Sequence, residues 1–175
     1  EIPNLKSNKF KNSDKNFFIF KQLLFYYKFN LFHELMPWFG SKACKKKYLK
    51  SFSNLKNLKN KKYPFWRLDT YFSNIKKTSL DIIEDGGWHF TNIKTPEDLY
   101  IKMKNFGHHD EFDESKISTI DLKDKIEQGI VFYNHFADKT SNDKWNYNYK
   151  LKKIEDELLP NYLIQNKVNF IKWFK

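Results

Sequence analysis

Cysteine and arginine are the two residue types that this sequence nearly lacks. Its one cysteine, Cys44, excludes an internal disulfide and a cysteine-rich zinc site. Its one arginine, Arg67, stands among cations that are otherwise all lysines. Apolar runs stay below the roughly 18–20 residues of a membrane-spanning helix, and no secretory signal pattern is visible. We therefore expect no transmembrane segment, and a location in the cytoplasm or at a membrane surface.

Aromatic residues and lysines are what the sequence has in abundance. Its 175 residues are 40% hydrophobic and 19% aromatic, enough for one domain with a sizeable core. The formal net charge is +11, which would suit a polyanion such as nucleic acid, lipid or a phosphorylated substrate. A compositional preference for lysine and asparagine explains this charge better, because surfaces that read phosphates tend to use arginine forks. Nucleic acid is therefore not the expected partner.

The stretch over residues 81–109 organises the chain. It opens with the apolar pair Ile82 and Ile83, which predicts a strand, and continues with the acids Glu84 and Asp85. Two glycines, an indole and an imidazole follow: Gly86, Gly87, Trp88 and His89. The glycines permit a tight turn or the close approach of a ligand. Polar side chains at a strand end, beside a helix N-terminus, are typical of α/β enzyme sites.

Capping signals predict two helices after this turn. Thr95 is expected to cap a helix that begins at Pro96, with acids in its first turn. Its core face should hold residues spaced by four and three, namely Leu99, Met103 and Phe106. Ser118 or Thr119 should cap a second helix, which has Leu122 and Ile126 on its inner face and stops at Gly129.

Apolar and polar runs predict the remaining elements. Continuous apolar runs indicate buried strands at residues 17–20, 23–27 and 130–133. The lysine- and asparagine-rich residues 51–62 predict a mobile loop. The amphipathic residues 158–174 predict a helical stretch broken near Pro160.

The run DGGWHFT, residues 85–91, followed by Thr95-Pro96-Glu97 at a helix start, resembles glycosyltransferase family 17. The opening Glu1-Ile2-Pro3 is similar to the end of that family's Ser-Asp-x-Asp-Glu-Ile-Pro segment. Phe65-Trp66-Arg67 and the aromatic residues 25–29 fit the same pattern. The family includes the β-1,4-mannosyl-glycoprotein 4-β-N-acetylglucosaminyltransferases. The resemblance covers essentially the whole chain and is closer to bacterial or viral members than to animal ones.

The resemblance implies an α/β fold, the C-terminal part of a GT-A-like (Rossmann-like) domain with a mixed sheet flanked by helices. It implies an inverting transfer of a sugar, expected to be N-acetylglucosamine from UDP-GlcNAc, to a glycan acceptor. It also implies a divalent metal, Mn²⁺ or Mg²⁺, held mainly by two aspartates that would precede Glu1. We therefore expect residues 1–175 to be a single, incomplete catalytic domain whose upstream nucleotide-binding part is missing.

Inverting transfer needs a base for the acceptor hydroxyl and positive charge for the leaving diphosphate. Asp85 is the first candidate base, because it follows a strand beside glycines that would let a substrate approach. Glu97 and Glu84 are the next candidates. Each has a structural alternative, since Asp85 can simply close the turn and Glu97 can stabilise the start of its helix.

Sugar and metal contacts form the second group of candidates. Trp88 is the expected sugar platform, because the C–H faces of a pyranose are apolar. Arg67 with Trp66 could hold the donor, and the backbone at Gly86 and Gly87 could approach the substrate. His89 and His135 are candidate metal ligands. Core packing of Trp88, pairing of Arg67 with Asp69 and a structural role for His89 remain the alternatives.

Two other functions stay open. A basic nucleic-acid-binding module would bring lysines and aromatic rings to one face and bind oligonucleotides in a salt-sensitive way. An inactive carbohydrate-binding remnant would bind sugars without turnover.

Overall fold

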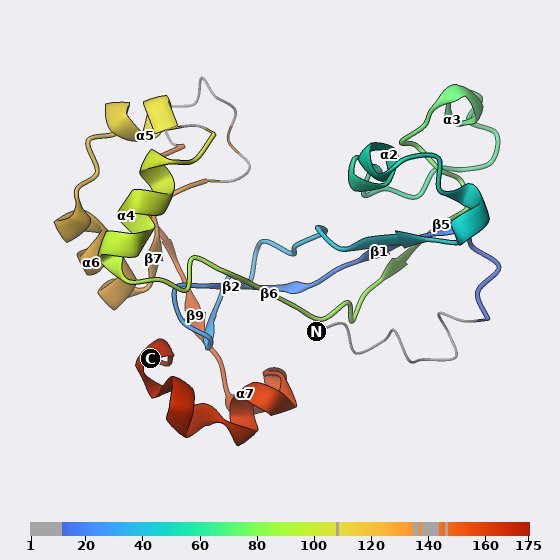
Figure 1. Ribbon diagram of the computed structural model, residues 1–175. Helices are drawn as coiled ribbons and strands as arrows, with labels where there is room; N and C mark the ends of the chain where they lie inside the picture. Colours follow the sequence, from blue (N-terminus) through green and yellow to red (C-terminus); the bar gives the residue numbers. More distant parts are fainter. Residues whose placement is uncertain (1–11, 108, 135–136, 138–143, 146) are drawn as a thin grey trace. The chain divides into compact units, whose positions relative to one another are not determined.

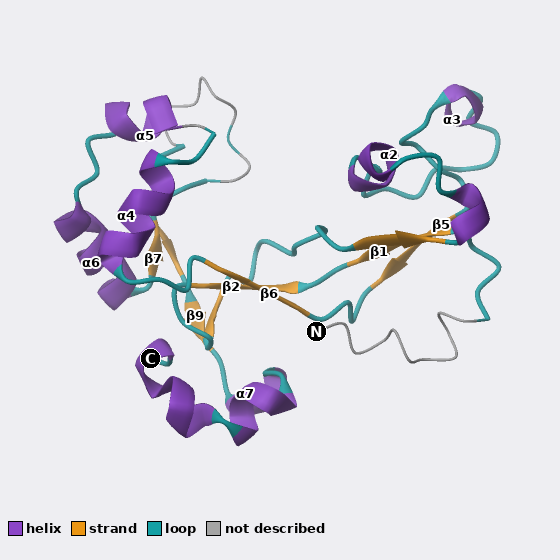
Figure 2. Ribbon diagram, in the orientation of Figure 1, coloured by secondary structure: helices purple, strands orange, loops and turns teal. Residues whose placement is uncertain are grey.

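The computed structural model describes residues 12–107, 109–134, 137, 144–145 and 147–175. Over these residues the protein is mixed α/β, with mixed sheets flanked by helices (Figures 1 and 2). The chain divides into two compact units. Unit 1 comprises Glu1–Leu23 and Met36–His89, and unit 2 comprises Leu24–Leu35 and Phe90–Lys175. The α/β expectation is confirmed at this level, while the GT-A arrangement stays a prediction.

Unit 1 is built on a three-stranded sheet in the order β4 (Lys42–Cys44), β1 (Phe17–Phe20), β5 (Leu80–Ile83). β1 pairs antiparallel with β4 and parallel with β5. Because alternate side chains of a strand point to opposite faces, Phe18 packs with Phe20 and Ile83, whereas Ile19 packs with Leu58 and Leu80. Burial on both faces explains why β1 is apolar throughout. The described part of the unit also contains three short helices: η2 (Lys46–Tyr48), α2 (Phe52–Lys56) and α3 (Asp69–Phe72).

Strands β2 (Leu23–Tyr26) and β6 (Trp88–Thr91) begin in unit 1 and end in unit 2. They belong to a four-stranded sheet in the order β6-β2-β3-β9, with β3 at Leu31–Phe32 and β9 at Lys152–Lys153. The N–H of Leu23 donates to the carbonyl of Gly87 at 2.9 Å, and that of Tyr27 to the carbonyl of Thr91 at 3.2 Å. From the first bond to the second, the donor and the acceptor each move four residues towards the C-terminus. β2 and β6 therefore pair in parallel.

Unit 2 packs three helices around one aromatic core. The helices are α4 (Pro96–Lys104), α5 (His109–Glu114) and α6 (Thr119–Gln128), and a short antiparallel pair is formed by β7 (Ile130–Val131) and β8 (Tyr149–Lys150). The chain ends in η3 (Asp156–Leu158), α7 (Asn161–Gln165) and η4 (Lys167–Trp173). The buried core consists of Tyr26, Tyr27, Leu31, Leu99, Met103, Phe112, Leu122, Ile126, Val131, Phe132 and Leu151. Among the described helices, none has the length and apolar character that crossing a membrane requires.

The capping signals are confirmed. The Thr95 hydroxyl accepts a hydrogen bond from the Asp98 N–H at 3.2 Å, and α4 begins at the next residue, a proline. Ser118 and Asp121 form a reciprocal capping box at the start of α6, with distances of 3.2 and 2.8 Å. α6 stops at Gly129, which adopts the left-handed conformation with φ 71°. These ends are set by local chemistry, which is why the sequence predicts them.

Three expectations about local structure need correction. The loop over residues 51–62 is instead interrupted by α2, and Leu58 is buried against the sheet. The strand over residues 130–133 is only Ile130–Val131, because β8 supplies just two partners. Phe106 lies beyond the end of α4 and is 42% exposed, so only Leu99 and Met103 form the helix's core face.

Candidate functional site

Residues 84–87, called here the acidic corner, lie where two parallel strands end. β1 and β5 run in register from Phe17 opposite Leu80 to Phe20 opposite Ile83, so their carboxyl ends meet. The N–H of Lys21 donates to the carbonyl of Ile83, and the N–H of Gly86 donates to the carbonyl of Lys21, both at 2.9 Å. These bonds tie the corner to the residue that follows β1. Glu84 and Asp85 are both exposed.

The two glycines of the corner are needed by the backbone itself. A Cβ atom on Gly86 would lie 2.7 Å from the backbone N and O of Lys21, closer than real contacts allow. Gly87 has φ 103°, which side chains of L-residues rarely tolerate. Both glycines are buried. The close approach at Gly86 is therefore to the backbone at the end of β1, and substrate contacts at Gly86 and Gly87 stay predictions.

An ion pair brings a cation to the corner. The Lys21 ammonium lies 2.7 Å from a Glu84 carboxylate oxygen, and the two side chains are 40% and 67% exposed. A pair this exposed contributes roughly 0–1 kcal/mol to stability, so its main consequence is chemical. It places one ammonium group beside the Glu84 carboxylate, and Asp85 is the next residue along the chain.

His89 packs against the indole of Trp38 and not against that of its sequence neighbour Trp88. Its ring stacks on Trp38, with centroids 4.4 Å apart and planes inclined by 13°. Trp38 is held by two backbone hydrogen bonds to Gln22, at 2.8 and 3.0 Å. The backbone of Gly40 lies directly against the indole of Trp38 and leaves no room there for a side chain. Trp38 was not among the site candidates that the sequence suggested.

Trp88 and His89 do not share a face. Both belong to β6, and successive side chains of a strand leave on opposite sides. The role of Trp88 as a sugar platform stays a prediction, separate from that of His89.

Gln22 organises the surroundings of the corner and was missed at the sequence level. It is 5% exposed, accepts a hydrogen bond from the Ser41 hydroxyl at 3.1 Å and donates to the carbonyl of Trp88 at 3.4 Å. One amide thereby links the loop before β4 to the start of β6. The available signal was a polar residue within the apolar run 17–27, since a buried amide needs partners.

Arg67 and Trp66 belong to another part of unit 1. Arg67 forms two hydrogen bonds with the Asp69 carboxylate, at 2.8 and 3.2 Å, and Lys76 contacts the same group at 2.7 Å. The Arg67 and Lys76 cations hold the pKa of Asp69 below its usual value, and Asp69 in turn raises the pKa of Arg67. α3 lies beyond the N-terminal end of β5, whereas the acidic corner follows the C-terminal end of that strand (Figure 1). Of the two alternatives for Arg67, the structure has the pair with Asp69, and donor binding by Arg67 and Trp66 stays a prediction.

The remaining candidates are Glu97 and His135. Glu97 is exposed at the second position of α4 in unit 2, where the helix dipole favours a carboxylate. Its catalytic role stays a prediction. His135 lies outside the described residues.

The described residues do not by themselves fit a divalent metal. No group of three or more histidine, cysteine, aspartate or glutamate side chains in the described part of the chain is placed to hold an ion. Glu84 pairs with Lys21, and His89 stacks on Trp38. The metal expectation concerns the family's upstream aspartates and stays a prediction.

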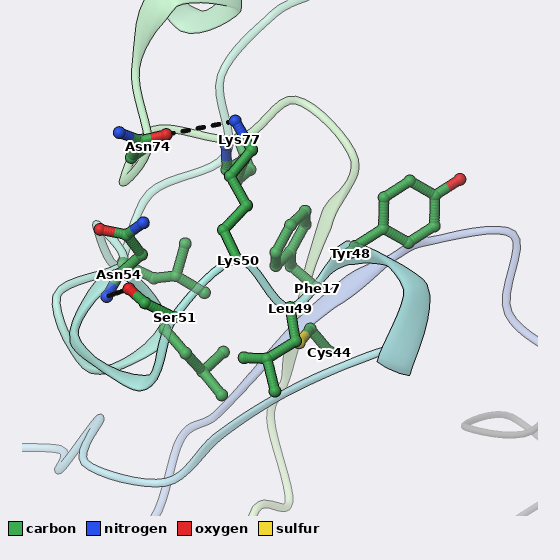
Figure 3. Close-up of a pocket in the computed structure, with 11 residues that line it drawn as sticks. Phe17, Cys44, Tyr48, Leu49, Lys50, Ser51, Asn54, Asn74 and Lys77 are labelled. Carbon is green, nitrogen blue, oxygen red and sulfur yellow. Dashed lines mark hydrogen bonds between the residues drawn. The ribbon is translucent and has the colours of Figure 1, made fainter.

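One pocket of unit 1 lies away from all of these residues (Figure 3). It opens beside Phe17, at the start of β1, and its rim carries the Lys50 ammonium hydrogen-bonded to Asn74 at 3.3 Å. Burial raises the pKa of the Cys44 thiol in its wall, which disfavours the reactive thiolate. None of the predicted site residues lines this pocket.

No family model matches the chain, and neither the curated proteins nor the solved structures that were searched gave a match. The resemblance to glycosyltransferases therefore rests on the residues quoted for it.

Proposed function

We propose that this protein is a glycosyltransferase that transfers a sugar, expected to be N-acetylglucosamine from UDP-GlcNAc, to a glycan acceptor with inversion. The observation that carries the proposal is the acidic corner. Exposed Asp85 stands beside the Lys21–Glu84 pair at the joined ends of two parallel strands. This arrangement supplies a proton acceptor, Asp85, and a cation, Lys21, at one end of the sheet. Asp85, Gly86 and Gly87 are also the DGG residues of the family resemblance.

Each group has a role that suits the transfer. The Asp85 carboxylate accepts the proton of the attacking hydroxyl, with Glu84 and Glu97 as the alternative bases. The Lys21 ammonium exchanges Glu84 for the diphosphate as negative charge develops on the leaving group. The stacked rings of Trp38 and His89 offer a flat surface near the corner for a pyranose.

The base assignment is tested by transfer from UDP-GlcNAc to glycan acceptors, with and without Mn²⁺. Asp85→Asn should lower kcat about 100-fold or more, the usual contribution of a general base. Asp14→Asn is the matched control, because Asp14 is another exposed acid of unit 1 paired with a lysine. A near-normal rate for Asp85→Asn would show that another group is the base.

The cation is tested with two lysines in closely similar settings. Lys21 and Lys15 are both 40% exposed and both contact an acid, at 2.7 and 3.0 Å. Lys21→Gln should slow transfer by about 10–100-fold, because positive charge at the leaving group is lost, while Lys15→Gln should leave the rate unchanged. Equal rates for both variants would remove Lys21 from the mechanism.

Donor binding separates the enzyme from the carbohydrate-binding remnant. UDP-GlcNAc should raise the melting temperature, and Trp38→Leu and His89→Ala should weaken the sugar-dependent part of this shift. Binding without transfer to any acceptor would indicate the remnant. The absence of any response to UDP-sugars, with and without Mn²⁺, would contradict the proposal.

A further inference from the structure

The net charge of this protein is concentrated in one stretch of unit 1. Residues 36–68, called here the basic stretch, contain nine lysines and Arg67 but no aspartate or glutamate. The net charge of the whole chain is +11, so the remaining residues are close to neutral. A uniform preference for lysine does not explain this distribution, because lysines elsewhere in the chain are balanced by acids.

The same part of unit 1 exposes large apolar side chains. The segment over residues 65–72, called here the aromatic loop, contains α3 and the turn before it. Five of its side chains are between 69% and 92% exposed in the described structure: Phe65, Trp66, Leu68, Tyr71 and Phe72. Phe52 of α2, within the basic stretch, is 79% exposed. Large apolar side chains exposed close together on a protein surface are a mark of interaction sites.

A polar network holds the aromatic loop in shape from within. Thr70 is buried and its hydroxyl donates to the carbonyl of Arg67 at 2.7 Å. The Tyr71 hydroxyl donates to the carbonyl of Phe65 at 3.3 Å. Arg67 also lies over the ring of Tyr63, 5.3 Å from its centroid. These contacts shape the loop from within while its large apolar side chains stay exposed.

The nearby acids are neutralised. Asp69 is the one acid of the aromatic loop, and it contacts both Arg67 and Lys76. Asp81 of β5 contacts Lys62 at 2.7 Å. Two cations contact the single acid of the loop, so this group of charges is net positive and lies among exposed apolar side chains.

We propose that the aromatic loop and the basic stretch form a surface that binds anionic lipid bilayers. The apolar side chains of the loop enter the boundary between headgroups and acyl chains, and the lysines remain among the anionic headgroups. Binding of this kind grows with the apolar area inserted and with the number of cations near the surface. The inference does not rest on the proposed glycosyl transfer, since the acidic corner takes no part in it and its test measures vesicle binding, not transfer.

The composition of the surface favours lipid over nucleic acid. A single-strand-binding surface offers flat ring faces on which bases stack. Here Phe65 and Trp66 meet edge to face, with ring planes at 84°, and the aliphatic Leu68 is exposed in the same loop. The lone arginine is engaged by Asp69, so the available cations are lysines, which respond to a charged surface without the geometry of a fork.

The proposal is tested by co-sedimentation of the full chain with vesicles of phosphatidylcholine, with and without phosphatidylserine. The protein should bind the anionic vesicles and release them at high salt. The double variant Trp66→Ser/Phe72→Ser should bind at least about tenfold more weakly, because the inserted apolar area is lost. The control Val168→Ser/Ile171→Ser removes side chains that are 87% and 65% exposed in unit 2, and it should bind as the unchanged protein does.

A charge-reversal pair gives a second measurement that does not depend on the aromatic loop. Lys59→Glu/Lys61→Glu changes two exposed lysines of the basic stretch and should weaken binding to anionic vesicles about tenfold or more. Lys94→Glu/Lys123→Glu makes the same charge change at exposed lysines of unit 2 and should have a much smaller effect. Equal losses in both pairs would mean that overall charge alone drives binding, and would overturn the proposed surface.

Two further outcomes would also overturn it. One is failure of the unchanged protein to bind phosphatidylserine vesicles at low salt. The other is tight oligonucleotide binding that Trp66→Ser/Phe72→Ser abolishes while vesicle binding persists, which would assign the surface to nucleic acid. Circular dichroism of each variant confirms that the fold is kept before binding is compared.

Discussion

The two units differ in what they do with their aromatic side chains. Unit 2 collects Tyr26, Tyr27, Phe112 and Phe132 into one core in which each is at most 1% exposed. Unit 1 has two small clusters of three buried residues, one on each face of β1, and leaves the aromatic loop exposed. Since a buried aromatic or aliphatic side chain contributes roughly 1.5–3 kcal/mol, the aromatic residues of unit 2 stabilise its fold. Those of the aromatic loop are available for binding.

The two units also treat histidine differently. In unit 1, His89 is half-buried and stacks on Trp38. In unit 2, His33 is 1% exposed and stacks on Tyr149 with centroids 4.1 Å apart. Neither ring nitrogen of His33 has a hydrogen-bond partner among the described residues. Burial lowers the pKa of His33, so the fold favours its neutral form.

The largest effect should come from replacing one aromatic residue in each unit. Phe132→Ala removes a fully buried ring from the core of unit 2 and should lower the free energy of unfolding by about 3–5 kcal/mol. Phe72→Ala removes a side chain that is 92% exposed and should change it by less than about 0.5 kcal/mol. Urea unfolding of both variants measures the difference. A large loss for Phe72→Ala would show that the aromatic loop is structural.

A smaller effect on stability should distinguish Gly86 of the acidic corner from Gly107 of unit 2, which has open space around it. Gly86→Ala forces a methyl group against the backbone of Lys21 and should cost about 1–3 kcal/mol, as overpacking usually does. Gly107→Ala is the control, because no atom lies within 4 Å of the Cβ it would carry. Urea unfolding should show the loss for Gly86→Ala alone. Equal stability of the two variants would mean that β1 and β5 can separate at the corner.

The pH dependence of stability should reveal the buried histidine. The unfolded chain takes up a proton at His33 below about pH 6.5, whereas the folded chain resists it because the pKa of His33 is lowered. The contribution of His33 is therefore complete above that pH and declines as the pH falls towards the folded pKa. His33→Phe should flatten the decline measured by urea unfolding between about pH 7 and pH 5. An unchanged slope would contradict burial of the neutral ring.

The smallest effect on stability should come from replacing Asp69, the acid of the aromatic loop. The pKa of Asp69 is lowered by Arg67 and Lys76, so its contribution is present at neutral pH and is lost as the pH falls through the folded pKa. Asp69→Asn should lower stability slightly at neutral pH and not in strong acid. The same variant should leave vesicle binding intact or strengthen it, since a negative charge is removed. Weaker binding would mean that the pair is needed to shape the loop.

Local signals predicted the helix ends and the apolar strands. Thr95, Ser118 and Gly129 act through bonds to residues at most four positions away, so their chemistry is visible in the sequence. The strands at 17–20 and 23–26 follow from continuous apolar runs. Residues 51–62 were misread because their composition is polar, whereas α2 depends on the single cap of Ser51 and on the burial of Leu58.

The candidate site was predictable in part. The acids and glycines of the corner stand together in the sequence, and the turn that they form was expected. Lys21, Gln22 and Trp38 were not, because they come from a strand end and a loop more than 40 positions away along the chain. Only the pairing of β1 with β5 brings Lys21 to Glu84, and only the Gln22–Trp38 bridge brings an indole to His89.

The sequence by itself determined the α/β character, the helix caps and the basic stretch, because each depends on neighbouring residues or on composition. The need for glycine at position 86 follows from the tertiary structure, since a side chain there would meet the backbone of Lys21. The tertiary structure decided which side chains meet. It stacked His89 on Trp38 instead of placing it beside Trp88, and it joined Arg67 to Asp69. The tertiary structure also kept the rings of the aromatic loop outside the core. Whether a side chain is buried depends on which strands and helices pack against it, and the loop sequence alone does not show this.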